Sequence, residues 1–184
     1  MFDMSDYVRQ AVEHYKGKAG ISELKGAATP YCPPGSLLPS DDDVRGELGS
    51  ESCSILMKDL WAARLARPDL SRGVCRLASR ITKWSKNDDK KVKRLMEYMN
   101  GSIDHRLRAY VCDLPEELEL WLFVDADLAG DTEDTKSSSG GYLVIVGPGT
   151  WFPVAWVMQK QGATARSTTE AETIAFATCL TSEA

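Results

Sequence analysis

The sequence predicts an α+β fold in which a helical region is followed by antiparallel strands and one last helix. Apolar residues recur at helical spacing up to Gly101, and from 107 to 158 they alternate or run continuously. A helix-capping motif then begins at Ser167. Helices that precede a block of strands, rather than alternating with them, are typical of α+β domains.

Four helices are predicted before Gly101. They are expected at about residues 5–17, 52–65, 68–81 and 88–99. Gly17 and Gly20 end the first helix, and Asn100-Gly101 ends the last. The Leu, Met and Trp stripes of these helices, in which Trp61 is included, indicate a hydrophobic core rather than a ligand site.

The second half of the chain predicts four strands, separated by turn sequences rich in Pro, Gly and Ser. The strands are expected at residues 107–112, 118–126, 141–147 and 153–158. Both faces of 118–126 are mostly apolar, which predicts a central strand covered on both sides. The last helix begins with Ser167-Thr168-Thr169-Glu170, a capping box in which Glu170 reaches back to the amide of Ser167.

Residues 29–50 are rich in Pro, Gly, Ser and acids and predict an irregular connection, since so long a stretch without structure is unusual inside a compact domain. The chain therefore divides into consecutive regions. These are a helix with its connector at 1–34, a linker at 35–50, a helical region at 51–104 and a strand-rich domain at 105–184.

Composition excludes several classes of protein. No apolar run approaches the roughly 20 residues that span a bilayer, and MFDMSDYVRQ lacks the features of a secretory signal. The five cysteines form no CxxC pair and are odd in number, which argues against a zinc site or a disulfide framework. We therefore expect an intracellular protein of the cytoplasm or nucleus, with reduced thiols and no membrane contact.

Charge is distributed unevenly along the chain. The net charge is −5, but residues 58–108 carry fourteen Lys and Arg against six Asp and Glu, so this segment is about +8 and the remainder about −13. A basic segment beside acidic ones could face phosphates; a solvated basic helix surface is the alternative. The expected nucleic-acid contacts are Lys83, Lys86, Lys90, Lys91, Lys93 and Arg94.

An acidic stretch, FVDADLAGD, follows the strand predicted at 118–126. Asp125 emerges on a face that is otherwise apolar, where an ionised carboxylate is costly unless it is paired or bound to a cation. Asp127 shares that face only if the strand stays extended, and Asp131 and Glu133 follow. A calcium loop starting at Asp125 is excluded, because its twelfth position is Lys136. A polar turn remains the alternative.

Glu172 is the second candidate, in the first turns of the last helix. It shares a helix face with Ala175, Phe176 and Cys179. The alternative role is a favourable interaction with the helix dipole, worth a few tenths to about 1 kcal/mol. Nucleophile elbows, P-loops and dinucleotide-binding fingerprints are missing from the sequence, and neither histidine has an obvious catalytic partner.

The two acidic stretches together resemble a known family. VDADLAGDTEDTKSSSGGYLVIVG followed by VAWVMQKQGATARSTTEAETIA is similar to the ribonuclease H region of copia-type retrotransposon polyproteins. Upstream, LARPDLSRGVCRLASRITKW resembles the connection before that region, and DYVRQAVEHYKG resembles the segment after the polymerase palm. Leu128, Thr173 and an extra Gly141 depart from the family pattern.

The resemblance implies a partial ribonuclease H-like fold, with three antiparallel strands and the first helix, after a helical connection. It implies that Asp125 and Glu172 are catalytic metal ligands, with Asp127 as a further metal candidate. Hard oxygen donors suit Mg²⁺ or Mn²⁺. The implied substrate is the RNA strand of an RNA–DNA hybrid, and the implied partner is the remainder of a Pol polyprotein.

The acidic ligands that the family adds later in its domain are expected to lie past Ala184, and the polymerase palm and fingers have no counterpart here. Two carboxylates alone hold a divalent ion weakly, so we expect a fragment with little or no hydrolysis of its own. The alternative is a non-catalytic retroelement remnant that acts as a nucleic-acid-binding or protein-interaction module.

Overall fold

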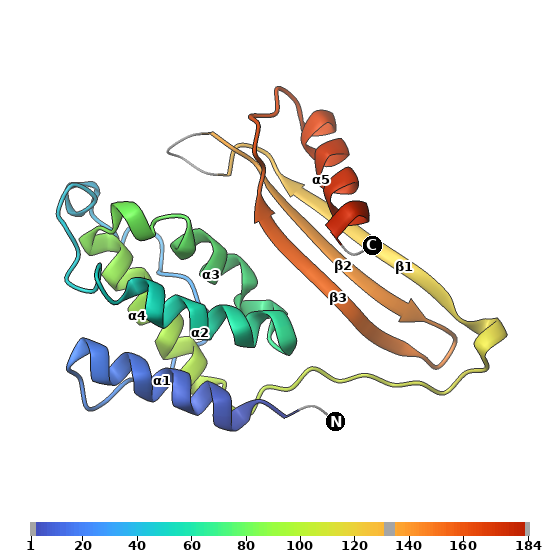
Figure 1. Ribbon diagram of the computed structural model, residues 1–184, viewed down its shortest axis with the longest axis horizontal. Helices are drawn as coiled ribbons and strands as arrows, with labels where there is room; N and C mark the ends of the chain where they lie inside the picture. The colour runs from blue at the N-terminus through green and yellow to red at the C-terminus, as the bar shows by residue number, and fades with distance from the viewer. Residues whose placement is uncertain (1–2, 131–134, 183–184) are drawn as a thin grey trace. The chain divides into compact units, whose positions relative to one another are not determined.

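The computed structural model describes residues 3–130 and 135–182, which form two compact units, Met1–Leu107 and Arg108–Ala184 (Figure 1). Within these residues the chain has five α-helices and one antiparallel sheet of three strands. The α+β prediction is thereby confirmed. Every helix in the described ranges is too short or too polar to span a bilayer.

The first unit is helical, and its elements follow the predicted order. They are α1 (Ser5–Ala19), α2 (Ser52–Leu65), α3 (Ser71–Ala78) and α4 (Lys86–Gly101), with short 3-10 turns at Pro39–Asp41, Pro68–Leu70 and Ile81–Lys83. The helix predicted at 68–81 is shorter than expected. Past Ala78, the Ser79 hydroxyl donates a 2.8 Å hydrogen bond to the Arg76 carbonyl, which competes with continuation of the helix.

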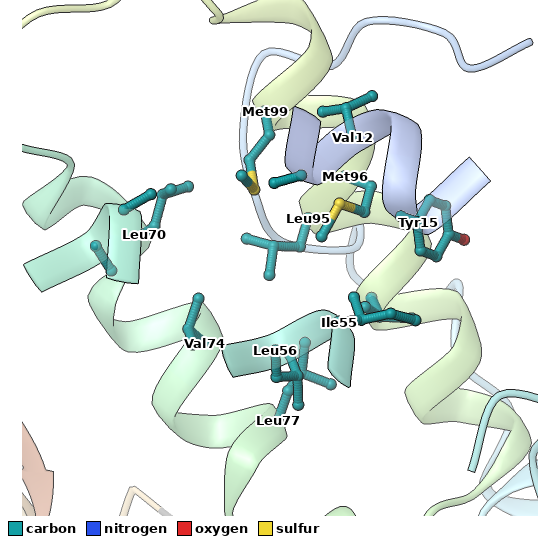
Figure 2. Packing of buried hydrophobic residues seen from close by; sticks show 14 of the residues in the cluster. Val12, Tyr15, Ile55, Leu56, Leu70, Val74, Leu77, Leu95, Met96 and Met99 are labelled. Carbon is teal, nitrogen blue, oxygen red and sulfur yellow. The ribbon is translucent and has the colours of Figure 1, made fainter. Parts of the chain in front are cut away.

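All four helices contribute to one hydrophobic core. Side chains from α1 to α4 point toward one another in Figure 2, and Leu56, Leu95 and Met96 are fully buried. The prediction for Trp61 is wrong: its side chain is 54% exposed, while Ala62 and Ala63 are buried in its place. The buried stripe of α2 is therefore narrower and smaller than its apolar sequence suggests.

The segment predicted to be a linker, 35–50, makes specific contacts with the start of α4. The amide of Lys86 donates to the Val44 carbonyl at 2.8 Å, and the amide of Gly46 donates to the Trp84 carbonyl at 3.2 Å. The carboxylate of Asp89 accepts hydrogen bonds from two backbone amides of the segment, at 47 and 48, and from the Trp84 indole. These bonds hold the segment along the helix.

The second unit is a sheet with one helix. Its elements are β1 (Glu119–Asp127), β2 (Ser138–Val146), β3 (Trp151–Lys160) and α5 (Thr168–Ser182), with a 3-10 turn at Pro115–Glu117 before β1. The strands are antiparallel in the order β1-β2-β3, and α5 packs against β1 and β2 (Figure 1). In this arrangement Asp125 lies in β1 and Glu172 lies in the helix that packs on β1.

Two strand predictions are corrected. Residues 107–112 form no strand; only Tyr110 bridges to Trp151, because the amides of Cys112 and Asp113 turn instead to the Thr150 hydroxyl. β1 is an edge strand of the described sheet rather than a central one. Its apolar residues line both faces, but among the described residues of this unit only one face is covered by a helix.

Candidate functional site

Asp125 lies on the face of the sheet opposite α5. Its neighbour Val124 pairs with Gly141, where an added Cβ would collide with the Cys179 thiol of α5. Since side chains alternate along a strand, Val124 faces the helix and Asp125 faces away. Asp125 is exposed. Solvent therefore reaches its carboxylate, and burial does not require a cation to balance its charge, contrary to the expectation from the apolar strand.

Asp127 is the last residue of β1, where it pairs with Ser138, and the turn that carries Gly130 follows it. Its carboxylate lies against Gly130, so that a Cβ added there would collide with it. The turn is further fixed by Ala129, which has a positive φ of 51° and donates its amide to the Ser137 hydroxyl at 3.2 Å. The strand therefore stays extended to Asp127, which by alternation starts on the same face as Asp125, while its carboxylate lies against the turn. Asp131 and Glu133 lie outside the described residues.

Glu172 lies on α5, half-buried, beside the row Ala171, Ala175 and Cys179 that faces the sheet. Ser167 caps the helix, since its hydroxyl accepts the Glu170 amide at 3.2 Å. The Glu170 carboxylate accepts from the amide of Arg166 at 2.7 Å, one residue earlier than a standard capping box. Glu172 makes no hydrogen bond or ion pair with any described residue, so capping does not require it.

Asp125 and Glu172 lie at the same end of the sheet but on opposite faces of it. Asp125 is on the open face, and Glu172 is on α5, which covers the other face. Ala126, next to Asp125, pairs with Ser139, and Ser139 is linked through Gln161 to Ala171, next to Glu172. Nowhere in residues 3–130 and 135–182 do three or more His, Cys, Asp or Glu side chains gather closely enough to hold a metal ion. The described carboxylates have the donor chemistry for Mg²⁺ but do not complete a site.

Four of the six predicted nucleic-acid contacts are engaged within the helical unit. The amines of Lys86 and Lys90 lie 3.1 and 2.6 Å from the Asp41 carboxylate, and their hydrogen bonds lower the pKa of Asp41. Lys91 pairs with Asp88 at 3.1 Å. Arg94 donates to the carbonyls at 29 and 31, at 3.0 and 3.2 Å. These cations hold the 29–50 segment and the start of α4.

The remaining two, Lys83 and Lys93, are exposed and pair with none of the described acids. They are the cations of this set that can meet a phosphate without breaking an internal bond. Sequence alone does not separate them from Lys86, Lys90 and Arg94, because the acceptors of those three lie more than forty residues away along the chain.

The chain is similar over most of its length to proteins of transposons. It is 34% identical over 138 residues, or 75% of its length, to the retrovirus-related Pol polyprotein from transposon RE2 of Arabidopsis thaliana. It is 30% identical over 162 residues, or 84% of its length, to that from transposon RE1 of the same plant. The chain is a relative of copia-type Pol polyproteins. The predicted resemblance is confirmed.

This Pol relative spans only 8% and 10% of the length of those two polyproteins. It is also 31% identical over 165 residues to the uncharacterized mitochondrial protein AtMg00810 of Arabidopsis thaliana, covering 90% of this chain and 65% of that protein. No protein-family model matches the chain, and no solved structure does. The similarity therefore corresponds to a small portion of those polyproteins and assigns no activity to the chain.

Proposed function

We propose that this chain is the part of a copia-type Pol that joins a helical connection region, residues 51–104, to the first half of a ribonuclease H-like domain, residues 105–184. The order of elements supports this: three antiparallel strands precede a capped helix, with Asp125 on the first strand and Glu172 on the helix. The observation that carries the proposal is the similarity to Pol polyproteins over at least three quarters of the chain.

In that role Asp125 and Glu172 would be ligands of Mg²⁺ or Mn²⁺, with Asp127 a weaker candidate. A bound divalent pair supplies an activated water and stabilises the leaving oxygen in phosphodiester hydrolysis. The described residues do not fit a complete pair of metal sites, because two carboxylates that start from opposite sides of a sheet leave most ligand positions empty. We therefore assign no hydrolytic step to this chain alone.

The edge position of β1 supports completion by further residues of a longer Pol chain. β1 is an edge of the described sheet, so its outer backbone groups are unpaired by any described strand. Residues added beside this edge would lie next to the strand that carries Asp125, and α5, which carries Glu172, packs on the same strand. The proposed function of the chain is to contribute two acids to a metal site for cleaving the RNA of RNA–DNA hybrids.

The first experiment measures cleavage of a labelled RNA–DNA hybrid by the 184-residue chain with Mg²⁺ or Mn²⁺. We expect no metal-dependent cleavage above that of Asp125→Asn and Glu172→Gln, with Glu116→Gln as an exposed acid control. Cleavage that both site variants abolish and the control retains would overturn the fragment argument and confirm the site. Cleavage equal in every variant would indicate a contaminating nuclease.

The second experiment measures hybrid binding as a function of salt. Each phosphate contact contributes about 0.9 to the slope of log affinity against log salt, a value for B-DNA that we apply to the hybrid. We expect Lys83→Ala and Lys93→Ala each to lower the slope by about that amount, with Lys25→Ala, outside the predicted set, as the matched control. A slope that all three variants leave unchanged would contradict nucleic-acid contact at Lys83 and Lys93.

A protein-interaction role is the second candidate, and the open face of the sheet favours it. Trp121, Phe123 and Trp151 are 46%, 45% and 42% exposed. The ring centroids of Trp121 and Phe123 lie 6.0 Å apart, and those of Phe123 and Trp151 lie 6.3 Å apart. Exposed apolar patches of this kind mark binding surfaces. Absence of hybrid binding at low salt, together with association of the chain through this face, would favour this candidate over the first.

A further inference from the structure

Gln161 is a buried amide at the end of β3 and has no role in the proposed chemistry so far. It is 4% exposed. Its backbone amide donates to the Ser137 carbonyl at 2.8 Å. Its side-chain Nε2 donates two further hydrogen bonds, to the Ser139 hydroxyl at 3.0 Å and to the Ala171 carbonyl at 2.9 Å. One residue therefore binds both the beginning of β2 and the first turn of α5.

Each end of this bridge lies next to a candidate carboxylate. Ser139 pairs across the sheet with Ala126, whose neighbour in β1 is Asp125. Ala171 immediately precedes Glu172 in α5. A hydrogen-bonded path therefore runs from the strand segment of one acid to the helix turn of the other, and the side chain of Gln161 is its centre. Fixing both ends fixes where Glu172 starts relative to β1.

The energetics of the amide point to placement rather than to core stability. Among the described residues, the Oε1 atom of Gln161 is buried and has no hydrogen-bond partner. An unpaired buried acceptor is unfavourable, and a leucine of similar size would fill the same space without one. What leucine cannot supply is the pair of directed bonds from Nε2. The feature that only glutamine gives at this position is the orientation of the first turn of α5.

We propose that Gln161 is a positioning residue that sets the first turn of α5, and with it Glu172, against the strand segment that carries Asp125. The link to a metal site rests on the proposed function, but the geometric claim does not. Gln161 touches neither the metal nor the substrate; it acts through Ser139 and Ala171. Loss of its two directed bonds should change the orientation of the first turn of α5. The later turns, packed through Ala175 and Cys179, should keep their place.

The test compares Gln161→Leu and Gln161→Glu with Gln159→Leu, a matched control two residues earlier whose side chain is exposed. Residual dipolar couplings of backbone amides in the intact chain report the orientation of residues 168–174 relative to β1–β3. Broadening of the same amides by added Mn²⁺ reports metal near Glu172 and near Asp125. The glutamate variant keeps the shape of glutamine, and its protonated carboxyl can donate one of the two lost bonds.

We expect Gln161→Leu to change the couplings of 168–174 but not those of 176–182, and to remove Mn²⁺ broadening near Glu172 while Asp125 keeps it. Gln161→Glu should show the same change at neutral pH and recover as its carboxyl is protonated, whereas Gln159→Leu should match the parent throughout. Unchanged couplings in Gln161→Leu would overturn the proposal, as would a uniform change over the whole sheet unit in both Gln161 variants, which would indicate a packing role only.

The two possible failures are distinguishable. If the parent chain shows no Mn²⁺ broadening at either carboxylate, the metal role in the proposed function fails, and the couplings alone decide whether Gln161 positions the helix turn. If broadening is present at both carboxylates and Gln161→Leu leaves it and the couplings unchanged, the metal role stands and the inference about Gln161 is wrong.

Discussion

The helical unit encloses its core, whereas the sheet unit covers only one side of its sheet. Sixteen buried apolar side chains from α1 to α4 and the segments between them form the first core. In the sheet unit, apart from Pro153, the described buried apolar residues are five, and most are small. They are Val144, Ala165, Ala171, Ala175 and Cys179. Large apolar side chains of the sheet, such as Trp121 and Phe123, stay about half exposed.

The units also differ in how they use charge. The helical unit buries Arg67, 2% exposed, whose guanidinium bonds the Asp69 carboxylate and both the carbonyl and hydroxyl of Ser102. Described charges near the candidate site of the sheet unit, by contrast, include the exposed Asp125 and the unpaired Glu172. The charge of Arg67 is thus satisfied within its own unit, while the unpaired acids at one end of the sheet are available for a ligand.

The largest expected effect comes from opening the helical core. Leu56 is 0% exposed, so Leu56→Ala should destabilise the unit by about 2–5 kcal/mol through lost burial and the cavity left behind. Met57, its neighbour on the outer face of α2, is 44% exposed, and Met57→Ala should cost less than about 1 kcal/mol. Denaturation of the intact chain, followed by hydrogen exchange in α2 and α4, measures both. Equal losses would contradict the enclosed core.

Breaking the Arg67 ion pair should come next. Asp69→Ala leaves a buried guanidinium uncompensated, which costs about 3–5 kcal/mol in a fully buried pair; we expect about 2–3 kcal/mol because the Asp69 side chain is 36% exposed. Asp104→Ala, at an exposed acid with no described partner, is the control. An Asp69→Ala variant as stable as the Asp104→Ala variant would show that the pair contributes little.

The same carboxylate gives a pH dependence. Burial raises the pKa of Asp69, but the hydrogen bonds from Arg67 and the Tyr98 hydroxyl outweigh it, and the pKa is lowered overall. Its stabilising contribution is therefore present above the unfolded pKa of about 3.9 and is lost as the pH falls through the lower folded value. Urea unfolding between neutral and acid pH should show a loss of stability that Asp69→Ala lacks.

Asp59 should behave in the opposite way. It is fully buried in α2, neither carboxylate oxygen has a partner among the described residues, and burial raises its pKa well above the ordinary value. Its contribution is most favourable below the unfolded pKa and is lost as the pH rises through the folded one. At neutral pH, Asp59→Leu should stabilise the unit by about 1–2 kcal/mol. A destabilising Asp59→Leu would show that the carboxylate has an essential partner.

The sequence predicted the helices well because their apolar spacing and caps are local. α2 at Ser52–Leu65 matches its predicted range. It did not predict the attachment of 35–50, which depends on Asp89 and Lys86 meeting backbone groups about forty residues earlier. It also placed β1 in a covered centre, because apolar residues on both faces of a strand do not reveal whether a second layer is present.

For the candidate site, the types and positions of Asp125 and Glu172 came from residue pattern and resemblance, but their relation to each other did not. Which face of the sheet each side chain starts from depends on the register of β1 with β2 and on the side where α5 packs. Gln161 was one match among many in the sequence. Its role as a bridge depends on a hydrogen bond to a helix turn ten residues away.

The smallest expected effect on stability comes from the open face of the sheet. Phe123→Ser removes a half-exposed ring that contacts Trp121 and Trp151, so the expected cost is about 0.5–1.5 kcal/mol. Any association through this face, the second candidate role, should weaken much more clearly in sedimentation velocity, because the variant interrupts the exposed cluster of Trp121, Phe123 and Trp151. Leu128→Ser, at a 40% exposed residue in the turn after β1, should leave association unchanged. If Phe123→Ser instead destabilises the sheet unit as strongly as Leu56→Ala destabilises the helical one, then the open face carries the stability of its unit and the contrast between the two units is wrong.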